Sequence, residues 1–453
     1  MDNYHSWGTY NVHDPSCCKL GDYYYMYSTD AILGENRKEA EEKNVPLGFI
    51  QVRRSKDLVK WEFVGWAFPE IPHEAVEWVR SHADGKGATN IWAPYIIPFG
   101  DKYRLYYCVS AFGLKTSYIG LAESASPEGP WMQRGCVVKT DATSVMNAID
   151  PSIIADSATG KWWMHYGSFF GGLYCVELNP ETGLPVQEGD QGHLIARRAT
   201  YWKDNLEAPE IIYNPELKQY YLFVSYDPLM TTYNVRVGRS DKAEGPFVDY
   251  FGVELKDTTN NFPILTAPYR FNNHPGWAGT AHCAVFTSDE GQYFMAHQGR
   301  LSPHNQMMDL HLRQVFFTSD GWPVVSPERY TGSASRKFSA ADIVGEWEII
   351  RVQEPAYERQ LQAGQILWGE GQLKNEEWNV SCTLSLKKDG QLDENKGYWK
   401  FAERGQLLSL TLNGESVDNL LVFAGHDWEN ETETVLFTGL DSRGRSVWGK
   451  RTK

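Results

Sequence analysis

Residues 147–169 read NAIDPSIIADSATGKWWMHYGSF. An Asp-Pro-Ser triplet leads into a short apolar run, and a Gly-Lys turn separates that run from a second one that is rich in aromatic residues. Two such runs joined by a glycine-containing turn predict a β-hairpin. Residues 11–30, NVHDPSCCKLGDYYYMYSTD, show the same order of features. This recurrence indicates an internal structural repeat.

The aromatic-led strand occurs five times along the chain. The five copies begin 57 to 79 residues apart and read GDYYYMYS from Gly21, GDKYRLYY from Gly100, GKWWMHYG from Gly160, LKQYYLFVS from Leu217 and GQYFMAHQ from Gly291. Each copy follows a short apolar strand, and further strands such as FIQVRRS and YIGLAES come after it. Four strands per repeat are typical of one β-propeller blade. The sequence therefore predicts an all-β fold with a five-bladed β-propeller, in which HEAVEWVRSHA (73–83) is the best helix candidate.

A second domain follows the repeats. The last repeat ends in SDGWPVVSPERY (319–330), and the Ser-rich stretch TGSASRKFSAAD (331–342) is typical of a linker. Alternating runs such as EWEIIRVQ, QLLSLTLNG and ETVLFTG then predict a small antiparallel β-barrel or sandwich. We therefore expect a propeller over residues 1–335 and a C-terminal β domain over residues 342–453. Either packing against the propeller or help in ligand binding would suit this domain.

The composition limits the classes of function. Of the 453 residues, 43 are Lys or Arg and 58 are Asp or Glu, which gives a net charge of −15. An acidic chain without a basic cluster is a poor binder of nucleic acid or of an anionic membrane. A neutral ligand such as a sugar suits it better. The aromatic content of 14% is high; most of these rings are expected to fill β cores, and some can stack on a ring-shaped ligand.

Three further features concern location and redox state. No apolar run approaches the length that spans a bilayer, about 18 residues. The first residues, MDNYHSWGTY, do not read as a signal peptide; a secreted or periplasmic protein whose signal peptide is absent from this chain and a cytoplasmic protein both stay open. The seven cysteines are odd in number and form no CxxC pair, so we interpret them as buried free thiols.

The repeats predict which side chains meet at the propeller axis. The first strand of each blade lines the central channel, so residues that open these strands converge there. The opening residues are Asp14, the Trp92-Ala93 pair, Asp150, Glu207 and His282. One Asp-Pro-Ser alone would be explained as a turn or cap. Three acids at equivalent positions would instead repel one another and raise one another's pKa values. Acid–base chemistry needs such shifted pKa values, whereas folding gains nothing from the repulsion. Two carboxylates flanking a bond are the machinery of glycoside hydrolysis, and a third can keep the acid protonated.

Several motifs resemble glycoside hydrolase family 43, in its group of two-domain arabinanases. They are HDPS (13–16), VRRSKDLVKWE (52–62), NIWAPYI (90–96), NAIDPS (147–152), EAPEI (207–211), the strand at His282, and LRQVFFTSDGWPVVSPERY (312–330). The resemblance covers residues 5–330 well and the C-terminal domain loosely. It implies an inverting glycosidase, a hydrolase of carbohydrate metabolism that degrades arabinan as an endo-1,5-α-L-arabinanase.

The resemblance also implies roles for the acids. Asp14 matches the general base that activates water, Glu207 matches the general acid, and Asp150 matches the residue that orients the acid and tunes its pKa. Glu210 competes for the role of acid, but the Glu-Ala-Pro context favours Glu207.

His282 resembles a histidine that such arabinanases place beneath the active site as a ligand of a metal, usually calcium, whose other ligands are water. One imidazole is an unusual ligand for a hard cation, so a satisfied core histidine is the alternative. His13 is interpreted as a strand-edge hydrogen-bonding residue.

Five residues are predicted to bind substrate. Trp92, Phe112 and Phe169 are placed to stack on a sugar ring, and Asn147 and Ser168 border the Asp150 strand, where they can hydrogen-bond hydroxyl groups. An aromatic residue next to a strand is otherwise a core residue by default.

Other functions stay open at this point. An exo-acting α-L-arabinofuranosidase or a β-xylosidase would use the same propeller, and loops at 32–47 and 70–89 are where endo and exo action would be decided. A non-catalytic carbohydrate-binding propeller would not need three acids. Fructan-cleaving propellers use three carboxylates with a nucleophile, but their motifs match less well. We expect a monomer that binds an arabinan polysaccharide or oligosaccharide and neither nucleic acid nor membrane.

Overall fold

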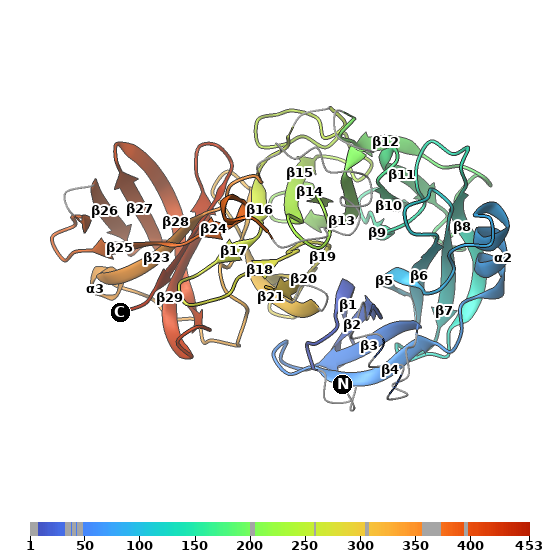
Figure 1. Cartoon of the computed structure of the whole chain (residues 1–453), viewed down its shortest axis with the longest axis horizontal. Helices are drawn as coiled ribbons and strands as arrows, with labels where there is room; N and C mark the ends of the chain where they lie inside the picture. The colour runs from blue at the N-terminus through green and yellow to red at the C-terminus, as the bar shows by residue number, and fades with distance from the viewer. Residues whose placement is uncertain are drawn as a thin grey trace.

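The computed structural model describes residues 8–31, 38, 42, 49–199, 204–257, 260–303, 308–355, 373–393 and 397–453. In these residues the chain forms four four-stranded sheets and two seven-stranded sheets. Figure 1 shows the sheets of the first part arranged around a common centre, with the C-terminal domain beside them. The fold is all-β, as the sequence predicts.

Each four-stranded sheet is one blade whose strands follow one another in the chain. The blades are β1 (His13–Leu20), β2 (Tyr23–Thr29), β3 (Phe49–Ser55) and β4 (Glu62–Phe68); β5 (Trp92–Phe99), β6 (Lys102–Ser110), β7 (Ser117–Ser124) and β8 (Met132–Thr140); β9 (Ser152–Ala155), β10 (Trp162–Ser168), β11 (Gly172–Leu178) and β12 (His193–Ala196); and β13 (Leu206–Asn214), β14 (Gln219–Tyr226), β15 (Asn234–Ser240) and β16 (Ile264–Thr266). All neighbours within a blade are antiparallel, as the predicted hairpins require.

The fifth repeat does not form a separate blade. Its strands β19 (Cys283–Thr287), β20 (Tyr293–Leu301), β21 (Met308–Phe317) and β22 (Pro323–Val325) belong to a seven-stranded sheet with β17 (Tyr269–Arg270), β18 (Trp277–Ala278) and β24 (Asn379–Val380). The structure thus has four separate blades where the sequence predicts five. The difference arises because β18 pairs with the same strand, β20, as β19 does.

The first strands of the repeats lie next to one another around the centre in Figure 1. β1 contacts β5, β5 contacts β9, β9 contacts β13, β13 contacts β19, and β19 contacts β1. Side chains near the start of these strands accept hydrogen bonds from the backbone of a neighbouring inner strand. Ser16 Oγ accepts from Ile96 N at 3.2 Å, Ser152 Oγ accepts from Ile211 N at 3.1 Å, and Glu210 Oε1 accepts from Val285 N at 2.9 Å. These bonds fix the inner strands relative to one another along the propeller axis. They therefore also fix the positions of the residues that open the strands.

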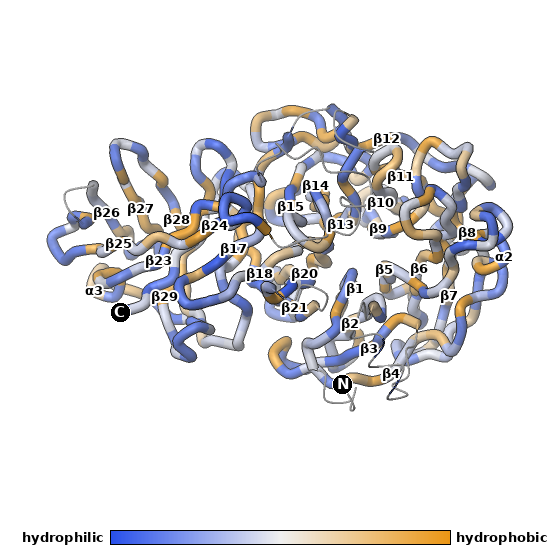
Figure 2. The backbone as a smooth tube through the Cα atoms, in the orientation of Figure 1, coloured by the Kyte–Doolittle hydropathy of each residue, from blue (hydrophilic) through white to orange (hydrophobic). Residues whose placement is uncertain are grey.

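The C-terminal domain is built on one antiparallel sheet in the order β25-β23-β30-β29-β28-β27-β26. Its strands are β23 (Gly345–Arg351), β25 (Cys382–Leu386), β26 (Gly397–Ala402), β27 (Leu407–Leu412), β28 (Glu415–Asp427), β29 (Thr432–Leu440) and β30 (Ser446–Arg451). The pairs Leu386–Leu392 and Gln391–Tyr398 link the two edge strands, so the sheet curls into a half-barrel. Figure 2 shows hydrophilic turns at its outer end and hydrophobic stretches along its middle strands. The sheet agrees with the predicted small antiparallel domain.

The two parts share a hydrophobic core. Ile350, Val352 and Trp448 of the C-terminal domain pack in one buried cluster with propeller residues such as Tyr269 and Trp277. β24 also pairs in parallel with β17. Because burial of apolar surface is the main source of stability, this shared core fixes the C-terminal domain against the last repeat.

Helical segments in the described part of the chain include α2 (His73–His82), α3 (Ala340–Ile343) and the 3-10 turn η3 (Asn375–Glu377). The predicted helix at 73–83 is confirmed. It buries Ala75 and Val79 against blade two, at the outer edge of the ring in Figure 1. The loop at 32–47, expected to bear on endo or exo action, lies outside the described residues except for Lys38 and Glu42.

All seven cysteines are free, as predicted. Four of them are buried, but Cys18 and Cys136 are only half-buried and Cys382, on the edge strand β25, is exposed, so the expectation of burial is wrong for Cys382 and only partly met by the other two. Among the described residues, no helix is long and apolar enough to cross a membrane.

Candidate active site

The residues that open the inner strands share an unusual backbone conformation. Asp14, Ala93, Asp150, Ala208 and His282 have φ between 39° and 57°, a region that L-residues rarely adopt. The pairing with the second strand shifts at this point in β1, β5 and β13, as at a β-bulge. Glu207 therefore lies one residue before the position equivalent to Asp14. The proline that follows each of Asp14, Asp150 and Ala208 marks the equivalent positions in the sequence, a signal that the spacing of the strands does not use.

Asp14 is buried among donors. Oδ1 lies 2.8 Å from His282 Nδ1, and Oδ2 lies 2.8 Å from His13 Nδ1 and accepts a hydrogen bond from Thr29 Oγ1 at 2.8 Å. Burial by itself would raise the pKa of Asp14, but the two neighbouring imidazoles lower its pKa well below the usual value. Asp14 is therefore ionised at neutral pH.

The two imidazoles beside Asp14 differ in charge. Burial lowers the pKa of His13. Burial also acts to lower the pKa of His282, but the charge and hydrogen bond of Asp14, with the charges of Asp150 and Glu207, raise its pKa to about 9. His282 is thus the ring that balances the acids.

Asp150 and Glu207 come from neighbouring blades and lie close enough for their charges to interact. Burial raises the pKa of Asp150 well above its usual value. The charge of His282 acts to lower this pKa, and the charge of Glu207 raises it further. Burial also raises the pKa of Glu207. Asp150 Oδ2 accepts a hydrogen bond from Ala208 N at 3.1 Å, which ties the two strands at this point. Two carboxyl groups that repel in this way retain a proton that a lone carboxyl would lose.

Glu207 receives a donor on each oxygen. Ser168 Oγ donates to Oε2 at 3.0 Å, and Tyr233 OH donates to Oε1 at 2.7 Å. The Glu207 side chain is partly exposed, whereas Asp14 and Asp150 are buried. The site therefore combines an ionised carboxylate with a partly accessible carboxyl whose pKa is raised, an arrangement suited to a base and an acid in one reaction.

Glu210 lies deeper and has a different environment. Its Oε2 accepts from Ser152 Oγ at 2.8 Å and its Oε1 accepts from Val285 N. Burial raises the pKa of Glu210 to about 7. Both oxygens are thus used to join blade four to the strands on either side.

The residues predicted to bind substrate lie at different depths. Phe112 is 42% exposed and its ring contacts that of Trp92 edge-on at 6.3 Å. Asn147 is buried and accepts from Ser117 Oγ at 2.6 Å. Phe169 is only 6% exposed. Ser168 donates a hydrogen bond to Glu207, as described above.

Sequence reasoning missed Thr29 and Tyr233 and gave His13 no role beside the acids. Thr29 pairs with His13 in the β1–β2 hairpin, so the hairpin register could have placed it near Asp14. Tyr233 lies in the connection between β14 and β15, and the repeat pattern gives no signal for the path of such a connection.

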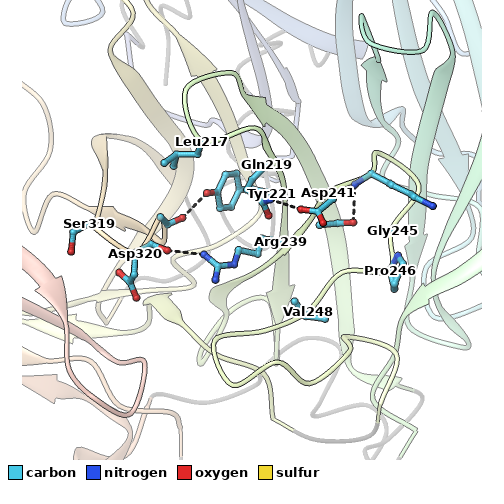
Figure 3. A pocket seen from close by; sticks show the side chains of 13 residues that line it. Leu217, Gln219, Tyr221, Arg239, Asp241, Gly245, Pro246, Val248, Ser319 and Asp320 are labelled. Carbon is cyan, nitrogen blue, oxygen red and sulfur yellow. Dashed lines mark hydrogen bonds between the residues drawn. The ribbon is translucent and has the colours of Figure 1, made fainter.

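A separate pocket of about 640 Å³ lies at the other end of blade four (Figure 3). Its lining comes mainly from the β13–β14 turn, the end of β15 with the segment after it, and the β21–β22 turn, and includes Leu217, Arg239, Asp241 and Asp320. Polar groups here already pair: Gln219 Nε2 donates to Asp241 Oδ1 at 2.5 Å, and Arg239 Nη1 donates to the Asp320 carbonyl at 2.8 Å. None of the predicted site residues lines this pocket.

Two places are relevant to metal binding. Among the described residues, one group of three side chains has possible metal-ligand atoms within 4.8 Å of one another. It consists of Glu328, Asp427 and Glu429. Lys450 Nζ is buried among them, 2.9 Å from Glu328 Oε1 and 3.0 Å from Asp427 Oδ1, and also pairs with Glu429. An ammonium group thus already balances much of this acidic cluster.

His282, the predicted metal ligand, has one ring nitrogen that could form a coordination bond. Its Nδ1 faces Asp14, and because a protonated imidazole has no lone pair, an ion could bind the ring only in place of the proton on the other nitrogen. Nε2 is therefore the nitrogen that would hold an ion.

Comparison with known proteins relates this geometry to characterised families. The model of glycosyl hydrolases family 43 matches residues 8–323, and that of a C-terminal lipocalin-like domain matches residues 327–449. An extracellular endo-α-(1→5)-L-arabinanase of Thermotoga petrophila is 29% identical, over 98% of this chain and 94% of that protein. The crystal structure of endo-1,5-α-L-arabinanase from Thermotoga petrophila superposes with a TM-score of 0.80 at 27% identity, covering 98% and 99% of the two chains.

A relative with another action covers less of the chain. An extracellular exo-α-(1→5)-L-arabinofuranosidase of Cellvibrio japonicus is 30% identical over 72% of this chain and 90% of that protein. The family model spans most of the chain and contains every residue of the acid cluster around Asp14. This chain belongs to glycosyl hydrolases family 43.

Proposed function

We propose that the protein is an inverting endo-1,5-α-L-arabinanase in which Asp14 is the general base, Glu207 the general acid and Asp150 the residue that orients the acid and tunes its pKa. The opposite pKa shifts of Asp14 and Glu207 carry this proposal. A base must be ionised and an acid protonated at the same pH, and two carboxyl groups of one site meet this condition only when their environments differ.

The mechanism needs one water molecule between the base and the sugar. Asp14 accepts a proton from the water, whose oxygen attacks the anomeric carbon while the glycosidic bond breaks and Glu207 protonates the leaving oxygen. The anomeric configuration inverts because attack and departure occur on opposite faces. His282 and Thr29 keep Asp14 in place for this step.

The endo action is supported by the extent of the similarity. The Thermotoga petrophila endo-acting relative aligns with both domains, whereas the exo-acting relative leaves more than a quarter of this chain unaligned. An arabinan chain is then the substrate, with Trp92 and Phe112 stacking on a sugar ring. Ser168, Phe169 and Asn147 would complete the sugar site, Asn147 through its Nδ2 because its Oδ1 already accepts from Ser117.

We further propose that β19–β22 act as the fifth blade, which is supported by the contacts of β19 with both β13 and β1. The domain limits of 1–335 and 342–453 agree with the strand-free stretch between β22 and β23. The protein is proposed to act outside the cytoplasm, in line with the extracellular relatives. We also propose that it acts as a monomer.

A calcium ion at His282 Nε2, with water as its other ligands, is part of the proposal. When bound, such an ion would supply positive charge near the three acids. His282 would be its one protein ligand, oriented by Asp14.

The test uses linear 1,5-α-L-arabinan. Endo action predicts intermediate oligosaccharides early in the reaction, and inversion predicts that the β-anomer is the first reducing end seen by proton NMR. Release of arabinose alone from the start would instead indicate an exo enzyme, and an initial α-anomer would contradict the roles given to Asp14 and Glu207.

A further inference from the structure

The phenol of Tyr233 is placed to control the acid. Its hydroxyl lies 2.7 Å from Glu207 Oε1, and the residue is fully buried. Burial raises the pKa of Tyr233 well above its ordinary value, so the phenol keeps its proton. On the other oxygen of Glu207, the donor is the hydroxyl of Ser168, which can rotate and either donate or accept.

The backbone that carries Tyr233 is held by buried polar groups. Arg198 Nη1 pairs with Asp227 Oδ1 at 3.0 Å, and Asn234 Nδ2 donates to Asp227 Oδ2 at 2.6 Å. The Tyr233 amide donates to the Pro228 carbonyl at 3.1 Å. Residues on both sides of Tyr233 are therefore anchored, and its ring has little freedom to leave Glu207.

These contacts make the two oxygens of Glu207 unequal. An oxygen that accepts from a fixed phenol is the carbonyl oxygen of a neutral carboxyl group, so the acidic hydrogen belongs on the other oxygen. That oxygen, Oε2, faces Ser168, whose hydroxyl can turn to accept.

We propose that Tyr233 is a positioning residue that fixes Oε1 of Glu207 as the acceptor and leaves Oε2 to hold and deliver the proton. The inference rests on the proposed role of Glu207 as general acid. In the step, the Oε2–H bond breaks and its proton joins the glycosidic oxygen, while the electron pair of the breaking bond from that oxygen to the anomeric carbon stays on the oxygen. Glu207 is left as a carboxylate that accepts from both hydroxyl groups.

A packing role and a positioning role predict different kinetics for Tyr233→Phe. The charged groups that face Glu207 are Asp14, Asp150 and His282, with Arg300 close to Tyr233. None of them is removed by this change. Loss of the phenol removes a hydrogen bond that favours the Glu207 carboxylate, so the alkaline limb of the kcat/KM profile should move to higher pH.

The experiment compares Tyr233→Phe with Tyr221→Phe. Tyr221 is also fully buried in the same cluster, but its hydroxyl donates to the Gly321 carbonyl at 2.5 Å, at the end of β14 away from the acids. The substrates are phenyl and 2,4-dinitrophenyl glycosides of an α-1,5-arabino-oligosaccharide. Dinitrophenolate leaves without a proton, whereas phenolate needs an acid.

For Tyr233→Phe we expect kcat to fall about 10- to 100-fold on the phenyl glycoside and less than about threefold on the dinitrophenyl glycoside, with the alkaline limb shifted upward. Tyr221→Phe should change neither the ratio nor the limb. Equal losses on both substrates, or an unmoved alkaline limb, would overturn the inference. Glu207→Gln separates it from the proposed function: if that variant lacks the same dependence on the leaving group, it is the assignment of the acid that fails.

Discussion

Nδ1 of His282 lies 2.8 Å from Oδ1 of Asp14, although the two residues open the last and the first repeats of the propeller. The contact joins the two ends of the repeat region at the point where the acids meet. It also holds Asp14 ionised, because a cationic imidazole lowers the pKa of an adjacent carboxyl group.

Removal of the acid or the base should abolish hydrolysis and leave the fold intact. Asp14→Asn and Glu207→Gln keep the size of each side chain, and loss of a general acid or base reduces rates by about 10²–10⁴. Turnover of linear arabinan, together with circular dichroism, measures both effects. A variant that kept more than about a tenth of the wild-type kcat would show that its residue has another role.

Chelation should test the metal proposed at His282. One protein ligand binds a hard ion weakly, so EDTA is expected to lower activity and added Ca²⁺ to restore it. His282→Ala should lose this response. Glu328→Gln is the matched control, since Glu328 belongs to the acidic cluster around Lys450. Full activity in EDTA, with no metal found by elemental analysis, would leave His282 as a charge partner of Asp14 alone.

Glu210→Gln should retain activity within about tenfold, because an amide can keep the bonds to Ser152 and Val285. The folded-state pKa of Glu210, about 7, exceeds the ordinary glutamate value of 4.5. The folded wild type therefore binds a proton more tightly than the unfolded chain does, and its stability falls as the pH rises from 4.5 to 7.

The variant lacks this titration. Its free energy of unfolding relative to wild type should rise over that pH window by up to about 3 kcal/mol and stay constant above it. Urea unfolding at several pH values measures the difference. A difference that does not change with pH would show that Glu210 titrates normally, and loss of turnover comparable to that of Glu207→Gln would return Glu210 to the list of candidate acids.

Lys450→Met should destabilise the whole protein. It leaves Glu328, Asp427 and Glu429 buried without their cation, and breaking a buried ion pair in this way costs about 3–5 kcal/mol. Because Glu328 follows the propeller and Lys450 lies in β30, we expect a single thermal transition at a lower temperature. Lys453→Met, at an exposed site of the same terminal segment, is the control. An unchanged melting temperature for Lys450→Met would mean that the cluster contributes nothing to the docking of the two domains.

The sequence alone was sufficient for the features that repeat. Hairpins led by aromatic residues recur because each blade must bury the same alternating face, so the propeller, the second β domain and the convergence of Asp14, Asp150, Glu207 and His282 could be predicted from spacing. The helix at 73–83 was also accessible, because its apolar spacing is local.

Tertiary structure alone decided what depends on exact register and on connections without a repeat. The spacing of the strands alone did not separate Glu207 from Ala208, the residue that takes the left-handed conformation. The fifth repeat merges with β17 and β18 through the pairing of β18 with β20, and β24 of the C-terminal domain joins this sheet by pairing with β17. Tyr233 reaches Glu207 through the path of one connection, and the ionisation of each acid depends on the donors that this three-dimensional arrangement brings to it. Local patterns determine which strands form, whereas the charge of a buried carboxyl group is set by neighbours from distant parts of the chain.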